Sequence, residues 1–106
     1  MSSTGPRASY AKRTDSNHAD IREALRAIGV GVHDASSAGA GIPDLICVYR
    51  GIPYFVEVKD GAKSPSRRKL TVSQVQFENM LNTHGGKLHV VTSVDEALAV
   101  FGARAA

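Results

Sequence analysis

Apolar residues recur with helical spacing in three separate parts of the chain. Within residues 14–29, positions 21, 24, 25 and 28 follow the i, i+3, i+4, i+7 pattern of one buried helix face. A glycine at position 29 then favours the end of this helix. Segments 70–86 and 93–102 are the second and third predicted helices. Each begins with a capping-box pattern: Thr71 with Gln74, and Ser93 with Glu96.

Four shorter apolar runs, bounded by Gly, Pro and polar residues, are typical of β-strands. They cover residues 30–35, 43–50, 53–59 and 87–92. The element order α-β-β-β-α-β-α predicts an α/β fold with a single mixed β-sheet flanked by helices. Residues 1–14 lack periodicity and are rich in Ser, Arg, Lys and Gly. We therefore predict a flexible basic N-terminal arm, followed by one domain over residues 15–106.

Three charged residues interrupt the second and third predicted strands: Asp44, Glu57 and Lys59. Side chains alternate along a strand, so Glu57 and Lys59 share a face. A connecting loop of residues 51–52 would set Asp44 opposite Lys59, whereas a loop of residues 50–51 would set it opposite Glu57. Because opposed residues share a face, both registers bring the three charges together on one face of the sheet.

Burying these charges is costly unless they are paired or bind a metal. The same face carries apolar residues at positions 46, 48 and 55, so we expect it to be covered. The alternative, a cross-strand ion pair on a solvated face, fits a covered face poorly. Carboxylate oxygens bind hard divalent cations, which lower the pKa of a bound water and polarise a phosphoryl oxygen. A lysine beside them can orient that water or neutralise developing charge. The glycine-rich segment before Asp44 is expected to let backbone and ligand approach closely.

The composition of the chain indicates the domain number, the type of partner and the compartment of the protein that carries this predicted metal site. The 106 residues suit one domain, and the formal net charge of +3 fits a polyanionic partner. Cys47, the single cysteine, excludes an intrachain disulfide and is expected to be a buried core residue. The sequence contains neither a signal-peptide h-region nor an apolar run of membrane-spanning length, so we predict a cytoplasmic protein.

The three charged residues resemble the signature of the PD-(D/E)xK nuclease superfamily. Pro43-Asp44 matches its first half and Glu57-Val58-Lys59 its second, after twelve intervening residues. More specifically, the chain is similar to small phage and bacterial VRR-NUC-like nucleases, which are Holliday-junction-resolvase-like. The matching segments fall within residues 14–100 and read DSN, GAGIPDL, FVEVKDG and LTVSQ.

This resemblance implies cleavage of DNA phosphodiester bonds with Mg²⁺ or Mn²⁺, on branched or structured DNA, in a bacterial or phage-infected host cell. Asp44, Glu57 and the backbone carbonyl of Val58 would be metal ligands, and Lys59 the catalytic lysine. Cutting both strands with one site per chain needs two subunits, so a homodimer is expected. Neither a membrane nor a nucleotide cofactor is expected as a partner. The lone GAG is no nucleotide-binding fingerprint.

Two further residues are candidates for the site. Many of the resembled nucleases add an acidic residue from the first helix, but this sequence departs from that pattern. On a helical wheel Asn17 lies on the inward face, Asp20 on the flank and Glu23 toward solvent. Asn17 is therefore the preferred candidate, with simple N-capping as its alternative. The capping box is a sufficient reason for Gln74, but the resembled nucleases also place a glutamine near the active site.

The segment that follows Lys59 is strongly basic and could contact DNA phosphates without sequence specificity. Its candidate DNA-binding residues are Lys63, Ser66, Arg67, Arg68 and Lys69. The expected function is thus a metal-dependent endonuclease. Two alternatives stay open. One is a non-catalytic DNA-binding or assembly module with the same fold. The other is a sequence-specific restriction-type enzyme, for which the sequence offers no separate recognition element.

Overall fold

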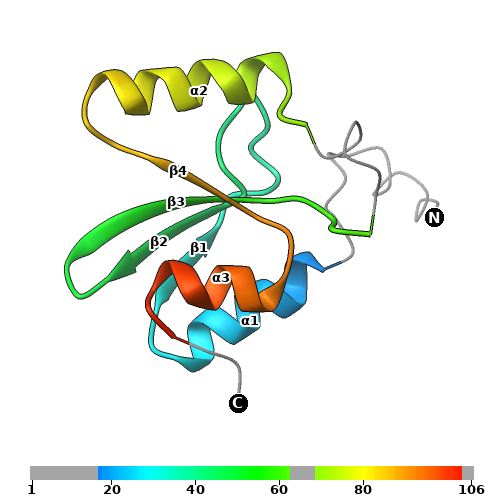
Figure 1. Ribbon diagram of the computed structural model, residues 1–106, viewed down its shortest axis with the longest axis vertical. Coiled ribbons are helices and arrows are strands. Elements are labelled where there is room, and N and C mark those ends of the chain that lie inside the picture. The colour runs from blue at the N-terminus through cyan, green and yellow to red at the C-terminus, as the bar shows by residue number, and fades with distance from the viewer. Residues whose placement is uncertain (1–16, 63–68, 104–106) are drawn as a thin grey trace, which may run out of the picture.

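The computed structural model describes residues 17–62 and 69–103, and within them the predicted element order is confirmed (Figure 1). The basic arm predicted at 1–14 lies outside the described residues. No helix among those described is long and apolar enough to cross a membrane. The elements follow one another as α1 (His18–Ala27), β1 (Gly31–Asp34), β2 (Leu45–Tyr49), β3 (Ile52–Val58), α2 (Val72–Thr83), β4 (Leu88–Val91) and α3 (Val94–Val100).

The strands form one mixed sheet in the order β1-β2-β3-β4. β1, β2 and β3 are successively antiparallel, and β4 runs parallel to β3. Tyr49 pairs with Ile52, so the β2–β3 turn consists of residues 50–51. Both turn residues have positive φ, 52° and 79°, as a type I′ turn requires. Continued by one pair, this register sets Asp44 opposite Glu57, which decides between the two alternatives that the sequence left open.

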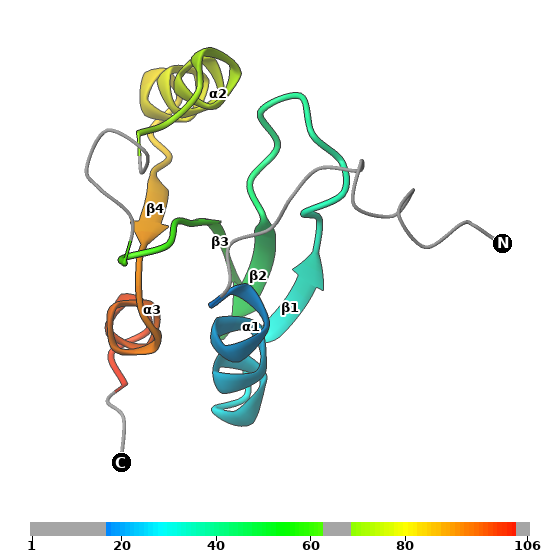
Figure 2. The same ribbon diagram turned by 90° about the vertical axis from the view of Figure 1, so that its right-hand side faces the viewer.

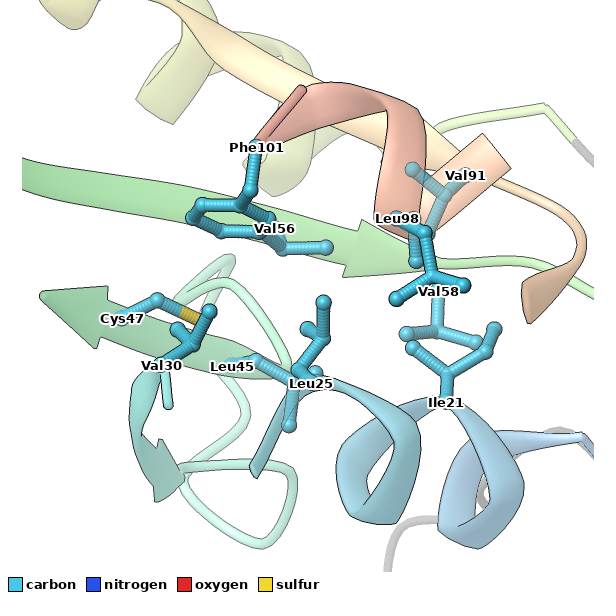
Figure 3. Close-up of a cluster of buried hydrophobic side chains, with 11 residues drawn as sticks. Ile21, Leu25, Val30, Leu45, Cys47, Val56, Val58, Val91, Leu98 and Phe101 are labelled. Carbon is cyan, nitrogen blue, oxygen red and sulfur yellow. The ribbon is translucent and has the colours of Figure 1, made fainter. Parts of the chain in front are cut away.

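The molecule has three layers. α1 and α3 cover one face of the sheet, and α2 crosses the other (Figures 1 and 2). Cys47 is fully buried in the core, as predicted, and burial raises the pKa of its thiol to about 11. The core lies between the sheet and the α1–α3 layer (Figure 3), and it includes Ile21, Leu25, Val30, Leu45, Cys47, Val56, Val58, Val91, Leu98 and Phe101.

α2 covers its face of the sheet only in part. Leu81 of α2 and Leu88 of β4 are buried, and Phe77 packs edge-on against Phe55 with ring centroids 5.8 Å apart. Val48, on the same face, is 51% exposed. The prediction that this face is covered therefore holds near Phe55 and is wrong at Val48. The reason is that α2 lies over the β4 side of the sheet, and β2 lies beyond it (Figure 2).

A polar contact on the opposite face ties α1 to β1. Asp34 Oδ2 lies 3.0 Å from Nε2 of the buried His18 and accepts a hydrogen bond from Arg22 Nη1 at 2.9 Å. Burial alone would raise the pKa of Asp34, but hydrogen bonds from Ser36, Arg22 and His18 outweigh it and hold that pKa well below its usual range. His18 therefore has a structural partner, which positions the start of α1 at the edge of the sheet.

Candidate active site

Asp44 and Glu57 lie opposite each other where β2 begins and β3 ends. Asp44 is 5% exposed and Glu57 is 2% exposed. The Val58 backbone N–H donates a hydrogen bond to Asp44 Oδ2 at 2.9 Å, which holds this carboxylate against the strand that carries Glu57. Along β3, Glu57 alternates with two residues of the core, Val56 and Val58. Glu57 and Asp44 therefore belong to the α2 side of the sheet, on one face as predicted.

Lys59 and Gln74 form a hydrogen-bonded cluster with Glu57. Lys59 Nζ lies 3.6 Å from Glu57 Oε2 and donates a hydrogen bond to Gln74 Oε1 at 3.0 Å. Gln74 Nε2 in turn donates to Glu57 Oε2 at 2.7 Å. The side chains of Lys59 and Glu57 are only 13% and 3% exposed, so the interaction is shielded from water. The cluster fixes an ammonium group beside a buried carboxylate.

Gln74 reaches this cluster from the first turn of α2, where the predicted capping box is confirmed. Thr71 Oγ1 accepts a hydrogen bond from the Gln74 backbone N–H, and the Thr71 backbone N–H donates to Gln74 Oε1 at 2.8 Å. Gln74 Oε1 therefore accepts hydrogen bonds from both Thr71 and Lys59. The two alternatives for this residue, helix capping and contact with the site, are compatible because Oε1 accepts from both Thr71 and Lys59 while Nε2 donates to Glu57.

The loop before Asp44 touches α2 at Gly41. Gly41 has a φ of 81°, and a Cβ added to it would lie 2.7 Å from the carbonyl carbon of Ser73 and closer still to its oxygen. The sequence suggested that glycines here let a ligand approach Asp44. In the structure the backbone of α2 makes that close approach at Gly41. Gly41 therefore docks the first turn of α2, and with it Gln74, against the loop that leads into Asp44.

Asn17 directs its side chain toward the ends of two strands. Its Nδ2 donates hydrogen bonds to the carbonyl oxygens of Thr92, at 2.8 Å, and Lys59, at 3.3 Å. It makes no side-chain capping hydrogen bond, so the N-capping alternative is wrong. Glu23 points to solvent as predicted: it is exposed and pairs with arginines of its own helix. Asp20, expected on the flank of the helix, is exposed as well.

The cluster offers oxygen ligands of the kind that a hard divalent cation prefers. Asp44 and Glu57 supply carboxylates from neighbouring strands, and Val58 adds a backbone carbonyl next in the chain to Glu57. Within residues 17–62 and 69–103, no group of three His, Cys, Asp or Glu side chains is placed to hold a metal. Mg²⁺ commonly binds through one or two carboxylates and keeps several waters, so the residues present fit this ion.

The predicted DNA-binding residues lie almost entirely outside the part of the chain that the structure describes. Lys69 is the exception, and it is exposed. Lys63, Ser66, Arg67 and Arg68 belong to the segment 63–68, which connects the end of β3 to the start of α2. In the sequence this segment lies between Lys59 and Gln74.

Two residues near the site, Ser73 and Thr92, were not predicted from the sequence. Each takes part through its backbone carbonyl: the carbonyl of Ser73 abuts Gly41, and that of Thr92 accepts from Asn17. Every residue carries such a carbonyl, so no residue type marks these positions. Gly41 and Asn17, which contact these carbonyls, could be singled out in the sequence, but the residues that they contact could not.

Comparison with known proteins agrees with this arrangement. A solved structure described as a VRR_NUC domain matches the chain with a TM-score of 0.61 and 26% sequence identity, over 82% of this chain and 92% of that chain. Neither a family model nor a curated protein matches the chain. The protein thus has the fold of a VRR_NUC domain, within the PD-(D/E)xK nuclease superfamily, and the predicted resemblance and fold class are confirmed.

Proposed function

We propose that this protein is a metal-dependent DNA endonuclease that hydrolyses phosphodiester bonds, preferentially in branched or otherwise structured DNA. Its structural similarity to a VRR_NUC domain supports nuclease activity. The observation that carries the proposal is the buried cluster of Asp44, Glu57, Lys59 and Gln74, in which each charged group has a defined partner.

A purely structural role explains this cluster poorly. Apolar residues of similar size in place of buried charged groups are often neutral or stabilising for a protein. A 106-residue domain with a modest core therefore gains little stability from two buried carboxylates beside a lysine. Ionisable groups held close together at low exposure are typical of catalytic sites. The cluster thus favours chemistry over packing.

In the proposed reaction a water oxygen forms a bond to phosphorus, and this water gives up a proton to the solvent. The bond from phosphorus to one deoxyribose oxygen breaks, and the electron pair leaves with that oxygen, which takes up a proton. One DNA end then carries the phosphate and the other a hydroxyl group. Lys59 stabilises the negative charge that develops at phosphorus, or orients the attacking water, through its ammonium group. Gln74 holds Lys59 in place by accepting one of its hydrogen bonds.

Mg²⁺ or Mn²⁺ is the proposed cofactor. Asp44, Glu57 and the carbonyl of Val58 would hold it, and the bound ion would supply a water of lowered pKa and polarise the phosphoryl oxygens. The hydrogen bond from Val58 N–H orients the Asp44 carboxylate, and that from Gln74 orients the Glu57 carboxylate. This pre-organisation lets the protein present both carboxylates without rearranging its strands.

We further propose that the enzyme acts as a homodimer, because one site per chain cuts only one strand. The exposed apolar surface favours the α2 side over α3 as the interface. α3 buries Ala97 and Leu98 in the core, and the exposed residues of this helix are Asp95, Glu96 and Ala99. The α2 side instead exposes large apolar side chains: Val48, Val72, Val75, Met80 and Val90.

The test is cleavage of a panel of DNA structures, including a plasmid and a four-way junction, under Mg²⁺ and under Mn²⁺. The wild-type protein is expected to cleave, with the junction preferred. Asp44→Ala is expected to abolish cleavage, and Lys59→Ala to lower its rate by about a hundredfold or more, since loss of one electrostatic stabiliser has an effect of this size.

Two exposed residues of the same types provide matched controls. Asp95→Ala on α3 and Lys87→Ala before β4 remove the same charges away from the cluster and are expected to cleave like wild type. Cleavage that survives both Asp44→Ala and Lys59→Ala would refute the proposal. DNA binding without cleavage, and no rise in melting temperature on adding Mn²⁺, would instead indicate the non-catalytic module. Cutting at one defined sequence would indicate the restriction-type enzyme.

A further inference from the structure

We infer that Asn17 is a positioning residue for Lys59, which acts through its side-chain N–H groups and not as a metal ligand. The inference rests on the proposed function, since Lys59 matters for catalysis only if the protein is a nuclease.

The backbone of Lys59 is held on both sides. Its N–H donates a hydrogen bond to the Val91 carbonyl at 2.9 Å, which extends the β3–β4 pairing by one residue. Its carbonyl accepts from Asn17 Nδ2 at 3.3 Å. Residue 59 follows the last residue of β3, so the sheet alone does not hold this carbonyl. Asn17 therefore limits rotation of the peptide group from which the Lys59 side chain extends toward Glu57.

Asn17 also binds the neighbouring strand end. The Thr92 carbonyl accepts the shorter of its two hydrogen bonds, at 2.8 Å. Thr92 is itself fixed by α3, because its N–H and Oγ1 donate to Glu96 Oε1 at 2.6 and 2.9 Å. One amide thus links the start of α1 to the ends of β3 and β4, and through Thr92 to the first turn of α3. This gives the Lys59 backbone a rigid support, in addition to the contact of its side chain with Gln74.

Both hydrogen bonds require a donor on residue 17. The amide nitrogen has two N–H groups and can serve two carbonyl oxygens, whereas a carboxylate only accepts hydrogen bonds at neutral pH. An aspartate here would set a negative charge against two carbonyl dipoles in a partly buried place. The other amide atom, Asn17 Oδ1, is buried and accepts no hydrogen bond from the described residues. A metal-ligand role would have to use Oδ1, while the positioning role uses Nδ2.

Asn17→Asp separates the two roles, since it keeps an oxygen ligand and removes the donor. Asn17→Ala removes both. Asn79→Asp, an exposed position on α2, is the matched control for the added charge. Single-turnover cleavage is measured against the concentrations of Mn²⁺ and DNA, at a temperature where circular dichroism shows every variant fully folded. The variants Asp44→Ala and Lys59→Ala set the background.

The maximal cleavage rate constant of both Asn17 variants is expected to fall about tenfold or more, because small displacements of a catalytic group have large effects. The half-saturating concentrations of metal and DNA should stay within about twofold of wild type. Asn79→Asp should match wild type throughout. Wild-type rates in Asn17→Asp, or half-saturation of this variant at a lower Mn²⁺ concentration, would overturn the inference.

A measurement on the wild-type protein tests the inference even if the variants do not fold or the protein does not cleave DNA. In NMR, the side-chain NH₂ protons of Asn17 should exchange with solvent far more slowly than those of exposed Asn79, and should show through-hydrogen-bond coupling to the Thr92 carbonyl. Exchange as fast as that of Asn79 would overturn the positioning role. Slow exchange in a protein that does not cleave DNA would refute the proposed nuclease function. It would still establish that Asn17 holds the ends of β3 and β4.

Discussion

At the level of single residues, a substitution of Gly41 tests how closely the loop before Asp44 must approach α2. Alanine at this position would need both a φ of 81° and a Cβ that overlaps the Ser73 carbonyl. The conformation alone costs about 1 to 2 kcal/mol, and overpacking costs about 1 to 3 kcal/mol more. We expect Gly41→Ala to lower the free energy of unfolding by about 3 kcal/mol, measured by urea denaturation, and to reduce cleavage by displacing Gln74.

Gly85 provides the matched control for this prediction. Its φ is 82°, almost that of Gly41, but a Cβ added there would meet no atom within 4 Å. Gly85→Ala should therefore show the conformational cost of about 1 to 2 kcal/mol alone and cleave normally. Equal stability losses in the two variants would show that the approach to Ser73 has no energetic consequence.

At the level of elements, the contacts that hold α2 against the rest of the fold come mainly from its first turn and less from the remainder of the helix. Only Gln74 and Leu81 of its twelve residues are buried. The first turn has two attachments to the rest of the fold, the approach of Gly41 to Ser73 and the contacts of Gln74 with Lys59 and Glu57, and its capping box with Thr71 fixes the start of the helix itself. The end of α2 that carries Gln74 is thus positioned by polar and backbone contacts and not by a continuous apolar face.

Substitutions in the first turn can separate helix capping from contact with the site. Thr71→Ala removes the capping oxygen and is expected to lower the free energy of unfolding by about 1 kcal/mol while cleavage persists. Gln74→Glu keeps an acceptor suited to the capping box but sets a second carboxylate against Glu57 Oε2, where Gln74 now donates at 2.7 Å. We expect this variant to keep its helix content by circular dichroism and to cleave at least about tenfold more slowly. Similar losses of cleavage in the two variants would show that Gln74 acts only through the cap.

At the level of the whole molecule, the positive charge that DNA binding requires lies outside the described fold. Residues 17–62 and 69–103 contain six Lys and Arg against nine Asp and Glu. The net charge of +3 therefore arises from residues 1–16, 63–68 and 104–106. By itself the described part would repel a polyanion at long range, apart from any bound divalent cation. We therefore propose that the segment between β3 and α2 supplies phosphate contacts beside the site.

This charge distribution predicts how salt affects DNA binding. Replacing Arg67 and Arg68 together by Gln should weaken binding to all DNA sequences alike and reduce the slope of log affinity against log salt by about two. The rate constant at saturating DNA should change little, because the cluster is intact. Arg50→Gln with Lys87→Gln removes the same charge from exposed positions of the described fold and serves as the control. An equal change of slope in both double variants would contradict the proposal that Arg67 and Arg68 contact the DNA phosphates.

Most of the fold followed from local patterns. The helical spacing of Ile21, Leu25 and their neighbours and the short apolar runs predicted every described element, because burial of one face imposes these periods on a sequence. Strand alternation also put Asp44, Glu57 and Lys59 on one face before their register was known. The exposure of Val48 was not foreseen, since the reach of α2 across the sheet depends on helix placement and not on the strand's own pattern.

The sequence by itself determined the order of elements, the shared face of the three charges and the inward direction of Asn17, because these depend only on periodicity along the chain. Tertiary structure decided the rest. The turn at residues 50–51 selected the register of Asp44 opposite Glu57, where the sequence allowed two. The Thr92 carbonyl that Asn17 binds lies 75 positions away, and only the parallel placement of β3 and β4 brings it beside Lys59. Contacts between backbone groups distant in sequence have no residue-type signature, so folding alone reveals them.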